Sequence, residues 1–187
     1  MAQKTPDVVT MVMLTDLLAE VCQKLDSANL RYMLSGSVAM SAYTVARNTR
    51  DIDIVIQLDA GNVDEFLALF QTGYYSHEPS IRQEVQQKRL FNLIHFESGL
   101  KIDFIVLKDS LFRQAEFARR QQADFLGVPV WIVSLEDLII SKIIWIQDYQ
   151  SELQMRDVAQ LLLNTNADRE YILAWCERLN LQLFSLL

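Results

Sequence analysis

Three aspartates are the residues of this sequence whose types and spacing could do chemistry. Asp51 and Asp53 alternate with apolar residues, and Asp103 stands between Ile102 and Phe104 in a second apolar run. Alternate side chains of a strand share one face, which would place Asp51 and Asp53 about 7 Å apart on the same side, where they repel each other unless a cation joins them. Magnesium prefers carboxylate and phosphate oxygens, and two such ions can clamp the attacking and leaving oxygens of a phosphoryl-type displacement. We therefore predict a metal site that Asp103 completes.

A Gly-Ser step supplies a candidate phosphate site. Gly36 and Ser37 break a strand predicted over 30–34, and a helix-compatible run over 38–47 follows at once. Glycine lets the backbone approach a ligand closely, serine favours a helix cap, and the first N–H groups of a helix attract an anion. The glycines of the chain form neither a P-loop nor a dinucleotide-binding motif, so those competing phosphate sites drop out.

The order of these pieces indicates chemistry more strongly than any piece alone. An Asp-x-Asp pair by itself more often belongs to the solvent-exposed face of a strand, and a Gly-Ser step more often forms an ordinary turn between two elements. Here a strand, Gly-Ser, a helix and a strand opening with Asp-x-Asp follow one another, and Asp103 then lies on the second strand of a predicted hairpin. This series resembles the nucleotidyltransferase superfamily that includes DNA polymerase beta, aminoglycoside nucleotidyltransferases and many bacterial toxins.

The resemblance implies a role for each matching residue. It implies that Asp51 and Asp53 hold two Mg²⁺ ions, and that Asp103 binds a metal and helps to deprotonate the attacking hydroxyl. It also implies that Gly36 and Ser37 hold the β- and γ-phosphates of a nucleoside triphosphate such as ATP.

A narrower resemblance, to the abortive-infection type of nucleotidyltransferase called AbiEii-like, covers most of the chain. It is carried by Arg47-x-Thr49-x-Asp51-x-Asp53, by Ser134-Leu135-Glu136-Asp137-Leu138-Ile139-Ile140-Ser141-Lys142 and by Arg156-Asp157. It implies a toxin-like enzyme in which Lys142 faces the triphosphate and Asp157 is an acidic position of the same nucleotide site. Arg47 and Thr49 are interpreted as local supports of the turn.

Lys142 also stands out by periodicity. A helix is predicted after a Ser134 cap, with Asp137 as its capping-box partner, and its apolar stripe consists of Leu135, Leu138, Ile139 and Ile146. Lys142 falls inside that stripe. A buried cation needs an anion, which could be the triphosphate or the Asp157 carboxylate of the next helix, and the sequence leaves both partners open.

The pattern of elements predicts an α/β or α+β fold, a small mixed sheet flanked by helices. Residues 1–133 are predicted as the core, and 134–187 as a C-terminal helical part packed on it in one compact unit. Helices are predicted over 8–28, 62–71, 110–122, 135–147, 151–163 and 167–179, and strands over 30–34, 51–56, 91–96, 100–107 and 128–133. Residues 74–88 are predicted as a loop with one short helix, where an acceptor-binding segment could sit.

Composition fits an ordinary intracellular enzyme. With 187 residues, 51% of them hydrophobic, the chain can bury a core as one domain. The apolar run over 138–146 is too short to span a membrane and the N-terminus lacks the pattern of a signal peptide, so we expect a cytoplasmic protein. A formal charge of −7 speaks against a broad nucleic-acid-binding surface. Residues 81–120 carry a small excess of Lys and Arg over Asp and Glu. These basic residues could form a solvated face, or Arg82, Lys88 and Arg89 could hold the end of an RNA.

Three functional classes follow from these observations. The leading one is magnesium-dependent transfer of a nucleoside monophosphate from a nucleoside triphosphate to a hydroxyl of an RNA end, a protein or a small molecule such as an aminoglycoside. A nucleotide-binding module without turnover is the second, and the intact set of Asp51, Asp53 and Asp103 argues against it. The third is a helical interaction protein or antitoxin-like partner, which no specific feature supports.

Overall fold

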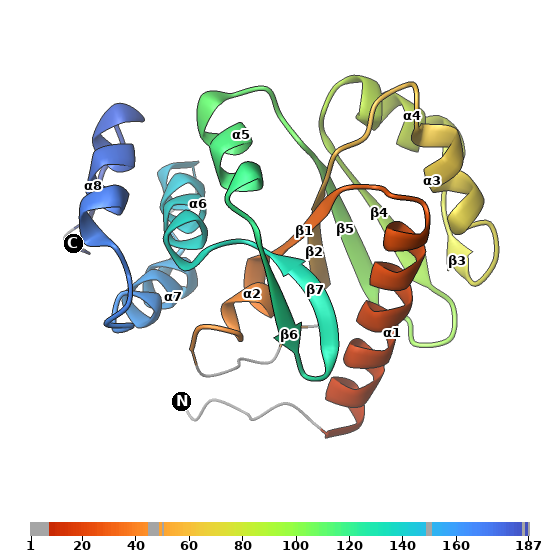
Figure 1. Ribbon diagram of the computed structural model, residues 1–187, viewed down its shortest axis with the longest axis horizontal. Helices are drawn as coiled ribbons and strands as arrows, with labels where there is room; N and C mark the ends of the chain where they lie inside the picture. Colours follow the sequence, from red (N-terminus) through yellow and green to blue (C-terminus); the bar gives the residue numbers. More distant parts are fainter. Residues whose placement is uncertain (1–7, 45–48, 50, 149–150, 185, 187) are drawn as a thin grey trace.

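A seven-stranded mixed sheet forms the centre of the computed structural model, which describes residues 8–44, 49, 51–148, 151–184 and 186 (Figure 1). The strand order from edge to edge is β3-β4-β5-β2-β1-β7-β6. The strands are β1 (Tyr32–Ser35), β2 (Asp51–Ile56), β3 (Tyr74–Tyr75), β4 (Leu90–His95), β5 (Lys101–Val106), β6 (Gln121–Phe125) and β7 (Val128–Ile132). β2 pairs antiparallel to β1 and parallel to β5. The predicted α/β class with a mixed sheet is therefore confirmed.

Helices pack on the sheet and form a group of their own at one end. They are α1 (Val8–Ser27), α2 (Gly36–Met40), α3 (Val63–Leu69), α4 (Glu78–Gln86), α5 (Leu111–Ala118), α6 (Leu135–Asp148), α7 (Glu152–Leu161) and α8 (Arg169–Arg178). α1 packs against β7 and α3, and α4 packs against α3 and β4. α6 packs against α2, α7 and α8. Figure 1 shows α6, α7 and α8 at the opposite end of the molecule from β3. No helix in the described part of the chain is long and apolar enough to cross a membrane.

The alternation of β2 decides which face of the sheet is core. Ile52 and Ile54 are fully buried, and the neighbouring Phe104 of β5 lies 5.0 Å between ring centroids from Phe66 of α3. Apolar side chains of alternate residues thus turn toward the helices α1 and α3, since burying them is favourable. The same alternation turns Asp51 and Asp53 to the opposite face.

One helix is shorter than predicted, and the end of its predicted range belongs to a strand. The helix predicted over 110–122 ends at Ala118, and β6 follows from Gln121 as an edge strand paired with β7. The turn between the two strands holds Leu126 and Gly127, both at positive φ. Two-residue hairpin turns usually contain Asn-Gly or Asp-Gly, so the Leu-Gly sequence did not predict a hairpin. Pairing with β7 then made residues 121–122 part of a strand, although their local pattern predicts helix.

Candidate active site

The sheet register brings two of the three aspartates together. Asp53 of β2 lies opposite Asp103 of β5, and Ser35 of β1 lies opposite Asp53 on the other side. Partners in register point to the same face, so Ser35, Asp53 and Asp103 form one row across three strands. Asp51 begins β2 one step along the same face, with its side chain 54% exposed.

The Gly36 turn is built against the Asp53 carboxylate. Gly36 has φ of +65°, and a Cβ at this position would lie 1.9 Å from Asp53 Oδ2. Glycine is therefore required both by conformation and by space. The Ser37 backbone N–H donates a hydrogen bond to Asp53. α2 begins at Gly36, two residues earlier than predicted, and ends at Met40, well before the predicted end. Ser35 rather than Ser37 therefore stands at the N-cap position, and its side chain makes no capping hydrogen bond.

Electrostatics at Asp53 favour a cation. Burial raises the pKa of Asp53 to about 6, and the negative charges of Asp103 and Asp51 add to the rise. The Ser37 N–H and the Lys142 ammonium act in the opposite direction. A carboxyl group in such surroundings gains from any additional positive charge nearby.

The Lys101 ammonium lies between the carboxylates of Asp51 and Asp103. Its Nζ lies 2.7 Å from Asp103 Oδ2 and 3.7 Å from Asp51 Oδ1. No motif marks Lys101 in the sequence, although its position two residues before Asp103 on one strand places both side chains on the same face.

The aspartates fit a divalent cation by their chemistry, but they are not gathered around one. Asp103 Oδ1 is buried and has no hydrogen-bond partner among the described residues, and oxygen ligands of this type suit Mg²⁺. Within the described chain, no group of three His, Cys, Asp or Glu side chains is placed so that it could hold a metal ion. A cation bound by Asp51 and Asp103 would have to displace the Lys101 ammonium.

Lys142 projects from α6 and is buried in an ion pair. It is 5% exposed, and its Nζ donates to Asp157 Oδ2 at 2.8 Å and to Gln154 Oε1 at 3.2 Å. Asp157 on α7 is 3% exposed. The structure therefore provides the carboxylate partner that the sequence left open. Lys142 also lines the cleft described below, so the pair stands at its wall.

A cleft of about 550 Å³ separates the sheet from the helices α5 and α6. Gly36, Ser37 and Asp53 line it on one side, and Lys142 and Trp145 line it on the other. Asp51, Asp103 and Asp157 are not among its lining residues. Arg113 and Trp145 reach the cleft only because α5 and α6 fold over the sheet, and no sequence pattern marked them.

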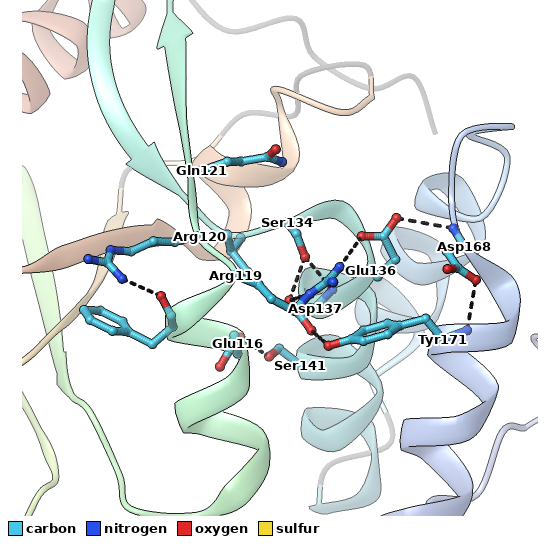
Figure 2. A network of polar contacts seen from close by, with 12 residues as sticks. Glu116, Arg119, Arg120, Gln121, Ser134, Glu136, Asp137, Ser141, Asp168 and Tyr171 are labelled. Atoms are coloured by element: carbon cyan, nitrogen blue, oxygen red, sulfur yellow. Dashed lines mark hydrogen bonds and ion pairs between the residues drawn. The ribbon is translucent and has the colours of Figure 1, made fainter.

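Figure 2 shows a network of polar contacts at the start of α6. Asp137 is fully buried and accepts hydrogen bonds from Ser134 Oγ at 2.7 Å, Arg119 Nε at 3.0 Å and Tyr171 Oη at 2.8 Å. The Asp137 N–H in turn donates to Ser134 Oγ, as expected for the predicted cap. The network joins α5, α6 and α8 and so positions the helix that carries Lys142.

The basic side chains considered for RNA are paired with acids. Arg82 lies 2.6 Å from Asp64, Arg89 lies 2.6 Å from Glu84, and Lys88 forms an ion pair with Asp109. This arrangement favours a solvated surface over a phosphate-binding one.

Arg47 and Thr49 were both predicted to support the turn before β2. Arg47 lies outside the described residues. Thr49 Oγ1 donates to the Asp51 carbonyl at 3.4 Å, in line with a local supporting role.

Solved structures of similar fold are nucleotidyltransferases. The crystal structure of ANT(2'')-Ia in complex with adenylyl-2''-tobramycin matches with a TM-score of 0.60 and 16% identity, over 90% of this chain and 98% of that one. Lincomycin-bound LnuA, a lincosamide antibiotic adenylyltransferase, matches with a TM-score of 0.51 and 17% identity, over 87% of this chain and 100% of that one. An antigenic nucleotidyltransferase-like protein from Paracoccidioides brasiliensis has a TM-score of 0.51 and 19% identity, over 91% and 90% of the two chains. At these identities the likeness shows the fold.

Sequence comparison gives the family. A search of curated proteins finds no significant match. The profile of the aminoglycoside-2''-adenylyltransferase family matches residues 17–137, which is most of the chain. The nucleotidyltransferase superfamily inferred from the aspartates and the Gly-Ser step is thereby confirmed, whereas the abortive-infection type stays a prediction. The chain belongs to the aminoglycoside-2''-adenylyltransferase family and is a nucleotidyltransferase.

Proposed function

We propose that this chain catalyses the Mg²⁺-dependent transfer of a nucleoside monophosphate from a nucleoside triphosphate to a hydroxyl of a small molecule, with pyrophosphate leaving. One observation carries the proposal: Asp53 and Asp103 lie opposite each other in register, and Asp53 packs against the Gly36 turn at the wall of a cleft. The family is named for adenylyl transfer, so ATP is the first donor to test.

The aspartates have separate parts in this proposal. Asp51, Asp53 and Asp103 would hold two Mg²⁺ ions, which when bound supply positive charge to the attacking and leaving oxygens. Asp103 Oδ1, which has no hydrogen-bond partner among the described residues, would accept the proton of the acceptor hydroxyl. Asp51 is the most exposed of the three and would complete the metal site from the solvent side.

The triphosphate would lie between the Gly36 turn and α6. The backbone at Gly36 and Ser37 approaches Asp53 closely, which leaves room for phosphate oxygens on the cleft side. Lys142 would neutralise the phosphates, and Asp157 would hold its ammonium in position. The predicted division of the chain would then have a function, since residues 1–133 supply the carboxylates and 134–187 supply Lys142.

A small-molecule acceptor is favoured over RNA and over a protein side chain. The relatives of similar fold include an enzyme complexed with adenylyl-2''-tobramycin and one bound to lincomycin. Arg82, Lys88 and Arg89, the side chains that would have held an RNA end, are already paired with carboxylates. All three of these ion pairs would have to break before an RNA end could use the side chains as phosphate contacts.

Transfer is tested by incubating the protein with Mg²⁺, each of the four nucleoside triphosphates and tobramycin or lincomycin. Pyrophosphate release gives the rate, and mass spectrometry identifies the modified acceptor. The variants Asp51→Asn and Asp53→Asn should each abolish transfer while circular dichroism and melting show an intact fold, because each removes a ligand charge. Asp64→Asn on α3, whose side chain is 77% exposed, is the matched control and should keep full activity. Unchanged magnesium-dependent activity in both Asp51→Asn and Asp53→Asn would refute the proposal.

A further inference from the structure

One exposed aromatic side chain stands in the wall of the cleft. Trp145 of α6 is 58% exposed, and it is the only aromatic residue among the described residues that line the cleft. Tryptophan is highly buried on average, and ligand pockets are lined mainly by apolar and aromatic side chains. The indole ring of Trp145 is therefore a candidate ligand contact, and neither the metal site nor the phosphate site uses it.

Trp145 lies on the same stripe of α6 as Lys142. Leu138, Ser141, Lys142 and Trp145 all line the cleft and are spaced as i, i+3, i+4 and i+7, which places them on one face of the helix. The first three are 1%, 7% and 5% exposed, in contrast to Trp145. The stripe thus runs from buried to exposed toward the end of α6 at Asp148, and Trp145 lies where the cleft opens to solvent.

The order of side chains along this stripe matches the order of groups in a nucleoside triphosphate. Lys142 is the phosphate contact of the proposed function, and Trp145 lies about 4.5 Å further along the helix axis, toward the open end. A nucleotide whose phosphates lie between Lys142 and the Gly36 turn can therefore place its base beside the indole. Stacking of a base on an aromatic ring is a strong contact, and its loss on alanine substitution lowers affinity by roughly tenfold.

The acceptor is expected on the other side of Asp53. Asp103, which would accept the hydroxyl proton, lies on β5, whereas the Gly36 turn follows β1, and β2 stands between these two strands. Asp103 is not among the lining residues of the cleft, so an acceptor that reaches it approaches from the β5 side. α6 packs against α2, which begins at Gly36, so Trp145 stands on the nucleotide side.

Resting on the proposed function, we propose that Trp145 stacks on the base of the donor nucleotide and makes the enzyme select purine over pyrimidine nucleotides. A stacked indole contacts the face of the base and does not read its hydrogen-bonding edge, so adenine and guanine are both accepted. A purine covers more of the indole than a pyrimidine does, so ATP and GTP bind more tightly than CTP and UTP.

The test compares nucleotides with their phosphate part alone. The full chain, with Mg²⁺ and without acceptor, is titrated calorimetrically with the four nucleoside triphosphates and with inorganic tripolyphosphate, which has no base. The parent should bind ATP and GTP at least about threefold more tightly than CTP and UTP. Trp145→Ala should weaken binding of ATP and GTP by about tenfold, narrow the gap to the pyrimidines and leave tripolyphosphate binding unchanged, because it removes only the stacking surface.

Two further variants separate stacking from a structural effect. Trp145→Phe keeps an aromatic ring and should recover most of the ATP affinity. Phe96→Ala is the matched control, since Phe96 is 65% exposed and does not line the cleft. It should change none of the affinities. Thermal melts of all three variants verify that they fold.

Tryptophan fluorescence provides an independent readout. The chain has three tryptophans, and Trp131 and Trp175 do not line the cleft. A stacked purine should quench the emission of Trp145, so ATP should quench the parent but not Trp145→Phe, although that variant binds ATP. Tripolyphosphate should quench neither protein.

Several results would overturn the inference. They are unchanged ATP affinity in Trp145→Ala, an equal loss of tripolyphosphate binding, an equal effect of Phe96→Ala, or equal binding of all four triphosphates by the parent. Unchanged ATP affinity in Trp145→Ala together with weaker binding of tobramycin would show that the indole holds the acceptor instead. Absence of pyrophosphate release with every acceptor, in a protein whose ATP binding depends on Trp145, refutes the proposed transfer and leaves the stacking role standing.

Discussion

Replacing Lys142 with methionine removes one partner of a buried ion pair, and the structure sets the size of the effect. Lys142 and Asp157 are 5% and 3% exposed, with 2.8 Å between Nζ and Oδ2. The variant Lys142→Met keeps the apolar stem but leaves the Asp157 charge buried without its cation, which costs about 3–5 kcal/mol. In a domain of this size each kcal/mol lowers the melting temperature by about 2–4 °C, so we expect a fall of about 6–20 °C.

A double variant separates the ion pair from nucleotide binding. Lys142→Met combined with Asp157→Asn removes both charges while keeping side-chain shape, so most of the lost stability should return. ATP affinity should not return, because a charged hydrogen bond to phosphate contributes about 1.5–3 kcal/mol, or roughly a tenfold to hundredfold change in affinity. The double variant therefore tests the phosphate role on a stable protein.

Calorimetric melting and calorimetric titration with ATP and Mg²⁺ measure the two effects. Lys88→Met is the control, since Lys88 forms an exposed ion pair with Asp109 and its loss should cost less than about 1 kcal/mol. A single Lys142 variant that melts within about 2 °C of the parent refutes the reasoning about the buried pair. A double variant that binds ATP as tightly as the parent refutes the phosphate role of Lys142.

Three further predictions concern the aspartate row. Because the pKa of Asp53 is raised to about 6 in the folded protein, its ionisation opposes folding, so the metal-free protein should lose about 3 kcal/mol from this group as pH rises from about 4 to 6. Urea unfolding in chelator should show this loss in the parent and its disappearance in Asp53→Asn; an identical pH slope in both would contradict it. Gly36→Ala should destabilise the protein by more than about 1 kcal/mol in the same assay, since Gly36 has φ of +65° and a Cβ would lie 1.9 Å from Asp53 Oδ2. Lys101→Met should tighten binding of Mn²⁺ without nucleotide, measured by the resonance signal of free Mn²⁺, because the ammonium no longer lies between Asp51 and Asp103; weaker binding would show that Lys101 supports the site.

The sequence by itself determined the elements whose patterns are local. The strand predicted over 51–56 is β2 with the same bounds, and its alternation correctly turned Ile52 and Ile54 to the core. The predicted cap at Ser134 formed, because Ser134 Oγ and the Asp137 N–H lie within one helical turn. The Asp137 carboxylate accepts from the Ser134 hydroxyl, in place of the backbone N–H that a capping box uses. Periodicity and capping depend on residues a few positions apart, so they can be predicted from the sequence without knowledge of the tertiary structure.

Tertiary structure alone decided which distant residues meet. The strand β6 exists because β7 offers an edge to pair with, although the residues before it read as helix. Asp53 and Asp103 became neighbours through the parallel register of β2 and β5, and Lys142 met Asp157 through the packing of α7 on α6. Arg113 and Lys142 face the Gly36 turn across the cleft for the same reason. Such contacts join segments tens of residues apart, and their energies come from burial and charge pairing that exist only after the layers have packed.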